Sequence, residues 1–322
     1  MSPWLTFAAL AAVLVAAGTA LARAADEIAE ATGVGRLWIG TILLAAATSL
    51  PEAATDVAAV RMGELDLAAG DLFGSSLANM LILAVVDLLP PRGRMLRSAD
   101  PAHALSAAQA IVLHAIAALF LLFTPSGTVL GVGPGPLLLA GGYLLGTRVL
   151  FRHTPPAPVV ASSPRSSVRT PALKFTAAAG VVLLAAPSFA WSAERIAEAT
   201  GLGTTFVGTL LVGLSTSLPE LVASLAALRM GAYDLAVGNL FGSNAFNMAI
   251  FVLLDLAHPG SLFGSLDPEH ALTCLLAILL MGFGLAAVVY RPGRKLPILD
   301  PDSLMVLLLY FAGIAWLYAR AA

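Results

Sequence analysis

Thr48-Ser49-Leu50-Pro51-Glu52 lies inside an apolar stretch of this 322-residue chain, and the same five residues return at positions 216–220. The agreement extends over Gly40–Met80 and Gly208–Met248, where 23 of 41 positions are identical without a gap. The offset between the two copies is a constant 168 residues. The chain is therefore a duplication, and a glutamate that directly follows a proline stands at the centre of each copy.

The composition indicates an integral membrane protein. Hydrophobic residues make up 59% of the chain, charged residues only 11%, and the mean hydropathy is +0.90. A soluble globular domain carries about 25% charged residues. The single cysteine, Cys274, excludes an intramolecular disulfide and any cysteine-rich metal site. We expect the lipid bilayer as a partner and no nucleic acid, and the oligomeric state stays open.

Runs of about 20 apolar residues predict ten membrane-spanning helices. We place them near residues 4–30, 36–60, 66–89, 102–124, 133–151, 172–198, 204–228, 234–256, 269–290 and 301–319. The first helix resembles a signal peptide, but it aligns with a helix in mid-chain, so we expect it to be retained. These runs predict a first repeat at 1–151, a linker rich in Pro, Ser and Arg at 152–170, and a second repeat at 171–322.

Five spans in each repeat predict that the second copy crosses the membrane in the opposite direction. If loops are assigned alternately to the two sides, 14 of the 17 Lys and Arg residues fall on one side. The positive-inside bias makes that side cytoplasmic, which places the linker inside and both termini outside a cell (inner) membrane. The predicted fold is therefore an all-α membrane protein with ten transmembrane helices in two inverted five-helix repeats.

Glu52 and Glu220 are the strongest functional candidates. A glutamate deep in a membrane-spanning helix is costly unless it is paired, hydrated or ligating. Pro51 and Pro219 each remove one backbone hydrogen bond, and this predicts a broken helix in both copies. Broken helices persist in membranes only where they are buried in protein or line a watery cavity, and in transporters they mark the substrate site.

Further polar residues follow these glutamates at helical spacing. The four stripes are Thr48, Glu52 and Asp56; Thr216, Glu220 and Ser224; Asp71, Ser75 and Asn79; and Asn239, Ser243 and Asn247. Their carboxylate, hydroxyl and amide oxygens are hard ligands, which suit calcium, magnesium or sodium. Taken singly, each serine or threonine is better explained by a bond to its own helix. Because polar residues recur around both Pro-Glu pairs, coordination of a cation is the better explanation for the set.

A family resemblance rests on the second copy in particular. Gly208-Thr209, residues 216–220, Asp234, Gly238-Asn239 and residues 242–247 resemble the alpha-repeat of the cation/calcium exchanger superfamily. The resemblance is greatest to the prokaryotic type of its sodium/calcium exchanger branch. It implies ten helices in two inverted repeats, with a mid-membrane cation site that opens to each side in turn. It also implies an antiporter rather than an enzyme, without a resident cofactor, that transports Ca²⁺ and Na⁺ or alternatively H⁺.

The resemblance also implies site residues, with Glu52 and Glu220 as the central calcium ligands. The calcium and flanking sodium sites would be served by Thr48, Ser49, Thr216, Ser217, the carbonyls near Ala45 and Gly213, and the side chains of Ser75, Asn79, Ser243 and Asn247. Proton-coupled calcium exchangers of the superfamily carry a glutamate where this chain has Ser75 or Ser243. The two serines therefore favour sodium coupling, and proton-coupled exchange of calcium or another divalent cation is the alternative.

The first copy departs from the family pattern. Asp71 and Ser76 stand where the family has asparagine, and Asp56 stands where a small residue is usual. The extra carboxylates would raise the affinity for divalent ions, hold a proton, or change the transported ion. An equally weighted interpretation places Asp56 or Asp71 in a vestibule, where it only attracts cations.

Two other function classes fit less well. A cation channel would use the same oxygens, but inverted repeats with broken helices favour alternating access. An intramembrane hydrolase needs a nucleophile with a base or a metal motif, and the chain has no HExxH and no obvious histidine partner for Ser49 or Ser217. It also has no phosphate-binding loop for an ATP-driven pump. We expect His103 and His270, at matching helix starts, to be structural or interfacial, and His114 to be a packing residue.

Overall fold

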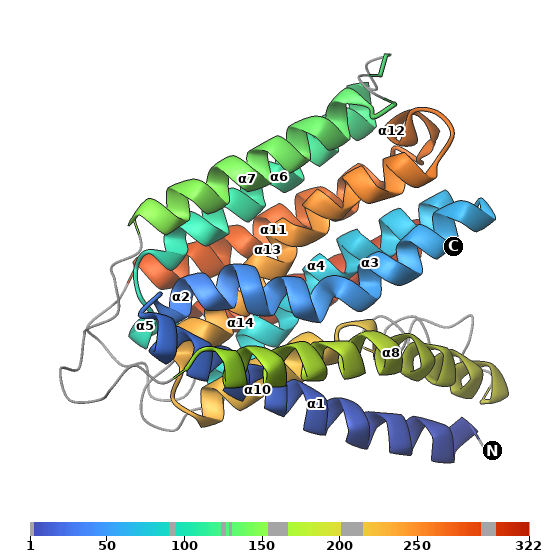
Figure 1. Cartoon of the computed structure of the whole chain (residues 1–322). Helices are drawn as coiled ribbons and strands as arrows, with labels where there is room; N and C mark the ends of the chain where they lie inside the picture. Colours follow the sequence, from blue (N-terminus) through green and yellow to red (C-terminus); the bar gives the residue numbers. More distant parts are fainter. Residues whose placement is uncertain are drawn as a thin grey trace.

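The computed structural model describes residues 3–89, 95–123, 127–128, 131–153, 167–200, 215–290 and 301–321. Throughout these ranges the regular secondary structure is helical and no strand is present, as the all-α prediction requires (Figure 1). The first half contains α1 (Pro3–Thr32), α2 (Arg36–Trp38), the π-helix η1 (Ile39–Leu44), α3 (Ala45–Met62), α4 (Leu65–Leu88), α5 (Met95–Ser98), α6 (His103–Phe123) and α7 (Pro134–His153). The second half contains α8 (Arg169–Ala199), α10 (Leu218–Arg229), α11 (Tyr233–Ala257), α12 (Leu262–Ser265), α13 (His270–Val289) and α14 (Pro301–Ala321).

In the described part of the chain, seven helices are long and apolar enough to cross a membrane. They are Pro3–Thr32, Arg36–Met62, Leu65–Leu88, His103–Phe123, Arg169–Ala197, Tyr233–Ala257 and His270–Val289. Of the three other predicted spans, 133–151 and 301–319 correspond to α7 and α14, which do not meet both requirements. The third, 204–228, includes residues 204–214, which lie outside the described part. The protein is thus a multi-pass membrane protein.

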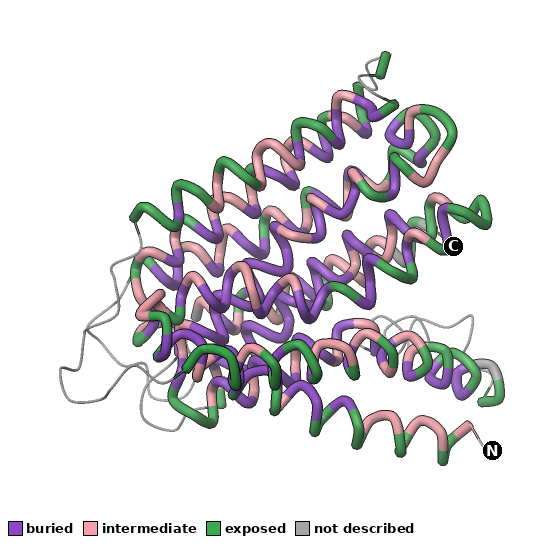
Figure 2. The backbone as a smooth tube through the Cα atoms, viewed as in Figure 1, coloured by how far each residue is buried: buried purple, intermediate pink, exposed green. Residues whose placement is uncertain are grey.

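The helices pack as a bundle in which α11 is central (Figure 1). It contacts η1, α3, α4, α6, α7 and α10, and most of its residues are buried (Figure 2). At one edge of the bundle, α1 runs alongside α8 as the most extensive helix pair, while α6 packs on α13. Exposed residues, drawn in green, lie along the outer helices (Figure 2). In a membrane protein such outward positions carry apolar side chains that face the lipid.

Two equivalent glycines place each glutamate helix against the helix that follows it. Gly63 ends α3 with φ 92°, and Gly231 follows α10 with φ 72°. Glycine takes this left-handed conformation without the steric cost that a side chain imposes. A turn of two or three residues therefore suffices to bring α4 back along α3 and α11 back along α10.

A second pair of glycines lets α11 approach η1 closely. A Cβ atom on Gly238 would lie 2.9 Å from the Leu37 carbonyl oxygen and 2.9 Å from the Thr41 nitrogen. A Cβ atom on Gly242 would overlap the Thr41 carbonyl group. These glycines are four residues apart and form the small-residue face that allows two membrane helices to touch through their backbones.

Aspartates near the starts of α4 and α11 bind the opposite repeat. Asp66 accepts a hydrogen bond from the Asp267 backbone N–H at 2.8 Å, and its carboxyl lies 3.1 Å from His270 Nε2. Asp234 accepts a backbone N–H just before α6 at 2.6 Å and lies 3.2 Å from His103 Nε2. The structure thus places both histidines at contacts between the repeats.

Aspartates near the ends of the same two helices repeat this arrangement. The Asp87 Oδ2 atom accepts a hydrogen bond from the Ser303 hydroxyl at 2.6 Å, and its Oδ1 accepts a backbone N–H of α5 at 2.8 Å. The Asp255 Oδ2 atom accepts the Gly133 N–H at 2.6 Å, and its Oδ1 accepts a backbone N–H of α12 at 2.9 Å. We call Asp66, Asp87, Asp234 and Asp255 the crossed aspartates, because each holds a segment of the other repeat.

Candidate cation site

The two glutamates come from different repeats and lie near each other inside the bundle. Glu52 on α3 is 3% exposed and Glu220 on α10 is 1% exposed. The carboxyl groups are close enough to repel each other. The Ser49 hydroxyl, one turn before Glu52, donates a hydrogen bond to Glu220 Oε1 at 3.2 Å. The duplicated Thr-Ser-Leu-Pro-Glu motif thus makes a direct contact with its own copy.

Thr48 connects the first glutamate helix to α11. Its hydroxyl oxygen lies 3.1 Å from the Ala45 carbonyl, 3.2 Å from Asn239 Oδ1 and 3.4 Å from Ser243 Oγ. The hydroxyl has one proton to donate among these oxygens. Three oxygens from two repeats therefore surround the Thr48 hydroxyl, and two of them, those of Ala45 and Ser243, belong to the predicted ligands.

Asparagines join α4 to α11 in the same way. Asn79 Nδ2 donates to Asn244 Oδ1 at 2.9 Å, and Asn244 Nδ2 donates to the Ser76 carbonyl at 3.2 Å. This orientation leaves Asn79 Oδ1 without a hydrogen-bond partner among the described residues. Asn244 is not among the residues that the sequence predicts for the site, although its place after Ser243 in the Gly-Ser-Asn motif could have indicated it.

Buried polar atoms without partners gather at this site. Among the described residues, eleven buried side-chain nitrogen or oxygen atoms have no hydrogen-bond partner, and eight of them belong to predicted ligands. These atoms are Glu52 Oε2, Asp56 Oδ2, Ser75 Oγ, Asn79 Oδ1, Ser217 Oγ, Glu220 Oε2 and both amide atoms of Asn247. Seven of these eight atoms are oxygens, and because buried polar groups are normally hydrogen-bonded, such a concentration of bare oxygens suits a bound cation.

The additional aspartates of the first repeat lie beside the glutamates. Asp56 is 3% exposed, whereas Asp71 is partly exposed. The Asp71 carboxyl contacts both the Asp56 carboxyl and the Thr216 hydroxyl. Asp56 and Asp71 are in turn close enough to Glu52 to act on its charge. These carboxylates act on one another in pairs, and among the described residues no three or more Asp, Glu, His or Cys side chains are arranged to hold a single metal ion.

The prediction of a broken helix in each copy was wrong for the first copy. The helix α3 continues through Pro51 without interruption, and the irregular turn precedes it as the π-helix η1. In the second copy α10 begins at Leu218, so Pro219 occupies a starting position that tolerates proline. A proline costs one backbone hydrogen bond, but packing on several sides can hold a helix together across it. Gly213, the remaining predicted carbonyl ligand, lies outside the described residues.

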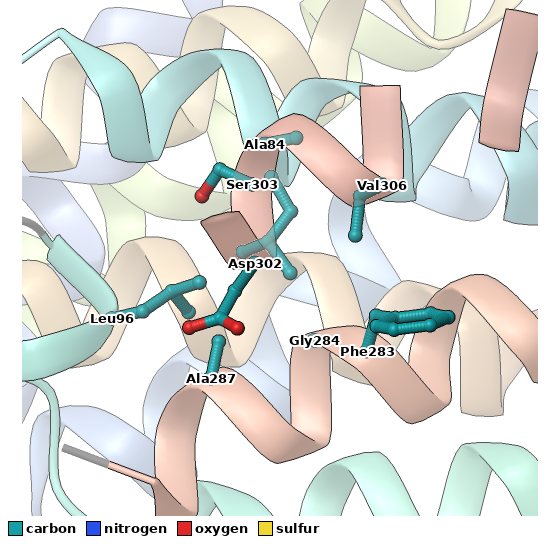
Figure 3. A pocket seen from close by; sticks show the side chains of 9 residues that line it. Ala84, Leu96, Phe283, Gly284, Ala287, Asp302, Ser303 and Val306 are labelled. Carbon is teal, nitrogen blue, oxygen red and sulfur yellow. The ribbon is translucent and has the colours of Figure 1, made fainter. Parts of the chain in front are cut away.

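One pocket lies elsewhere, between α4, α5, α13 and α14 (Figure 3). Its lining is mainly apolar, with side chains such as Leu96 and Phe283, and includes Asp302 and Ser303. None of the predicted ligands lines it. Because Ser303 is the partner of Asp87, the pocket is adjacent to a structural contact rather than to the carboxylate site.

Comparison with known proteins identifies relatives over most of the chain. Residues 2–147 and 171–319 match a family model described as sodium/calcium exchanger protein. The putative antiporter CaxA of Alkalimonas amylolytica is 28% identical over 280 residues, which cover 81% of this chain and 83% of that protein. The inner membrane protein YrbG of Escherichia coli K12 is 28% identical over 318 residues, covering 91% of each chain.

The fold also resembles a solved structure. A structure of the sodium-calcium exchanger NCX_Mj superposes with a TM-score of 0.75 at 20% sequence identity and covers 97% of both chains. At this identity the likeness concerns the fold.

Proposed function

The chain belongs to the sodium/calcium exchanger protein family, and on that premise we propose that it is a secondary active antiporter that exchanges calcium for sodium. One observation carries the proposal. Two glutamates from the two repeats are buried next to each other, and each has a carboxyl oxygen without a hydrogen-bond partner among the described residues. Buried charges of this kind require a counter-charge, and a transported cation supplies it.

Charge balance explains why two ions would exchange rather than bind together. The carboxylates of Glu52 and Glu220 neutralise one Ca²⁺ or two Na⁺ ions, but they cannot neutralise both loads at once. Calcium and sodium therefore compete for the same oxygens. If the empty site is unfavourable to enclose, because two bare carboxylates repel each other, the protein changes sides only when it is loaded.

The serines beside the glutamates support sodium as the coupling ion. Ser75 and Ser243 are 3% and 0% exposed, and the Ser243 hydroxyl lies 3.4 Å from that of Thr48. Hydroxyl and carbonyl oxygens serve a monovalent ion without adding a further negative charge. A glutamate at either position, as in the proton-coupled exchangers, would instead supply a group that carries a proton.

The proposed architecture has ten spans in two inverted repeats, at 1–151 and 171–322, joined by a cytoplasmic linker at 152–170. This arrangement would place both termini outside a cell (inner) membrane. It is supported by the matching order of helices in the two halves, since α1, α3, α4, α6 and α7 correspond to α8, α10, α11, α13 and α14. Inversion would present the two copies of the motif to opposite sides of the membrane.

Calcium uptake into proteoliposomes tests the proposal. Vesicles loaded with sodium should take up radioactive calcium when diluted into sodium-free buffer, and Glu52→Gln or Glu220→Gln should reduce this uptake to background. Glu64→Gln is the matched control, because it removes a carboxylate from the exposed turn after the same helix and should leave uptake unchanged.

Full uptake in either glutamate variant would contradict the assignment of the site. Uptake that follows an imposed proton gradient and ignores the sodium gradient would establish the proton-coupled alternative. Single-channel currents in a planar bilayer would point to a cation channel instead.

A further inference from the structure

The duplication allows one pair of positions to be compared directly between the repeats. Asp56 corresponds to Ser224 and Asp71 to Asn239, because each pair is separated by the same 168-residue offset. In the second repeat, Asn239 Nδ2 donates a hydrogen bond to Ser224 Oγ at 3.1 Å. Both residues are neutral and fully buried, so this pair needs no further partner to balance a charge.

The equivalent pair in the first repeat has a different chemistry. The carboxyls of Asp56 and Asp71 are in contact where the second repeat has an amide and a hydroxyl. Two ionised carboxylates only accept hydrogen bonds, so the pair needs either a shared proton or a bound cation. Both positions have become acidic together, which converts a neutral hydrogen bond into a pair of negative charges.

An independent observation indicates that this pair has a ligand. Asp56 is 3% exposed, and its Oδ2 atom has no hydrogen-bond partner among the described residues. The neighbouring Glu52 Oε2 has none either. The Thr216 hydroxyl adds a neutral oxygen beside Asp71. A buried carboxylate oxygen without a donor is costly unless a proton or a cation balances its charge.

We propose that Asp56 and Asp71 bind a second divalent cation, beside the one assigned to Glu52 and Glu220. The inference rests on the proposed function, because it takes the glutamate pair as the first site. One divalent ion neutralises two touching carboxylates from a single position, whereas two monovalent ions would need two positions. Carboxylate and hydroxyl oxygens are the ligands that calcium prefers. Asp71 is partly exposed, whereas Asp56 is buried.

Calcium binding to the purified, full-length protein tests this assignment by equilibrium dialysis. The wild type should bind about two calcium ions per chain, and D56S/D71N should bind about one. This double variant reproduces the Ser224–Asn239 pair of the second repeat, a combination that the fold already accommodates. E52Q/E220Q should also keep about one ion, bound at the aspartates. Glu64→Gln serves as the control for the loss of an exposed carboxylate.

Equal numbers of bound ions in the wild type and D56S/D71N would overturn the second site. So would a complete loss of binding in E52Q/E220Q, and this result does not depend on how well D56S/D71N folds. Sodium-driven calcium uptake, measured on the same preparations, separates the two proposals. Uptake by a wild type that binds a single ion refutes only the second site, whereas two bound ions without uptake refute only the exchange function.

Discussion

Replacing Gly242 with alanine should impair the protein far more than the same change at Gly74, its counterpart in the first repeat. A Cβ atom on Gly242 would overlap the Thr41 carbonyl oxygen and lie 2.7 Å from the Thr41 carbonyl carbon. A Cβ atom on Gly74 meets nothing within 4 Å. The two substitutions are chemically identical and occupy equivalent positions, so they differ only in what the added methyl group meets.

The structure gives the size of the effect. Ordinary contact begins at 3.4 Å, so η1 and α11 must separate by more than about 0.7 Å around the new methyl group, because the Thr41 carbonyl oxygen lies nearer than the carbonyl carbon. Overpacking of this kind costs about 1–3 kcal/mol. The same movement stretches the contacts of Thr48 with Asn239 and Ser243, now 3.2 and 3.4 Å, beyond hydrogen-bonding distance. Each lost hydrogen bond adds about 1 kcal/mol, so we expect a total near 3–5 kcal/mol.

Two measurements check this prediction. Thermal unfolding in detergent should show a midpoint that is roughly 10 °C lower for Gly242→Ala, and the midpoint of Gly74→Ala should stay close to that of the wild type. Sodium-driven calcium uptake should fall about 100-fold in Gly242→Ala, because a displacement near 1 Å misplaces the ligands of α11. If the two variants unfold and transport alike, the backbone contact between η1 and α11 does not position the site.

Three further substitutions probe other contacts. Asp255→Asn should lower the free energy of unfolding by about 1–3 kcal/mol, because one of the two backbone N–H donors bound by Asp255 loses its acceptor. Chemical denaturation measures this change, and an unchanged free energy of unfolding would show that the contact is unimportant. Asn244→Ala removes the acceptor that orients the Asn79 amide, so we expect calcium to bind about tenfold more weakly. An unchanged calcium affinity in equilibrium dialysis would show that Asn244 is not needed to orient Asn79. Lys174→Ala breaks an exposed ion pair with Glu27 and should change stability by less than about 1 kcal/mol, so a large fall in the unfolding midpoint would contradict a purely surface role.

The helices were largely predictable because membrane thickness fixes their length. The predicted spans 66–89 and 102–124 agree closely with α4 at Leu65–Leu88 and α6 at His103–Phe123. The π-helix η1 was not predictable, because it packs against glycines of α11 that lie about 200 residues further along the chain. The predicted break at Pro51 was wrong for the same reason. The local chemistry of proline favours a break, but packing against other helices keeps α3 continuous.

The proximity of Glu52 and Glu220 was predictable from recurrence, since polar residues appear twice around Pro-Glu. The hydrogen-bond partners of the polar residues were not predictable, because helical spacing shows which residues share a face but not which helix that face contacts. Nothing near Asn79 in the sequence indicates that Asn244 is its partner. Asp66 and Asp234 occupy the same position in the two copies, which indicated that the aspartate has a role. Their histidine partners could not be predicted, because they lie in the opposite repeat.

The crossed aspartates have a consequence for the biogenesis of the protein. The ribosome delivers the first repeat to the membrane before the second exists, and Asp87 then waits for Ser303 in the last helix of the chain. Asp255, by contrast, finds Gly133 already in place when it is synthesised. The first half therefore enters the membrane before the residues of the second half that bind its aspartates have been made. A chain divided within the linker should yield two fragments that insert separately, and the first should escape proteolysis only when the second is co-expressed.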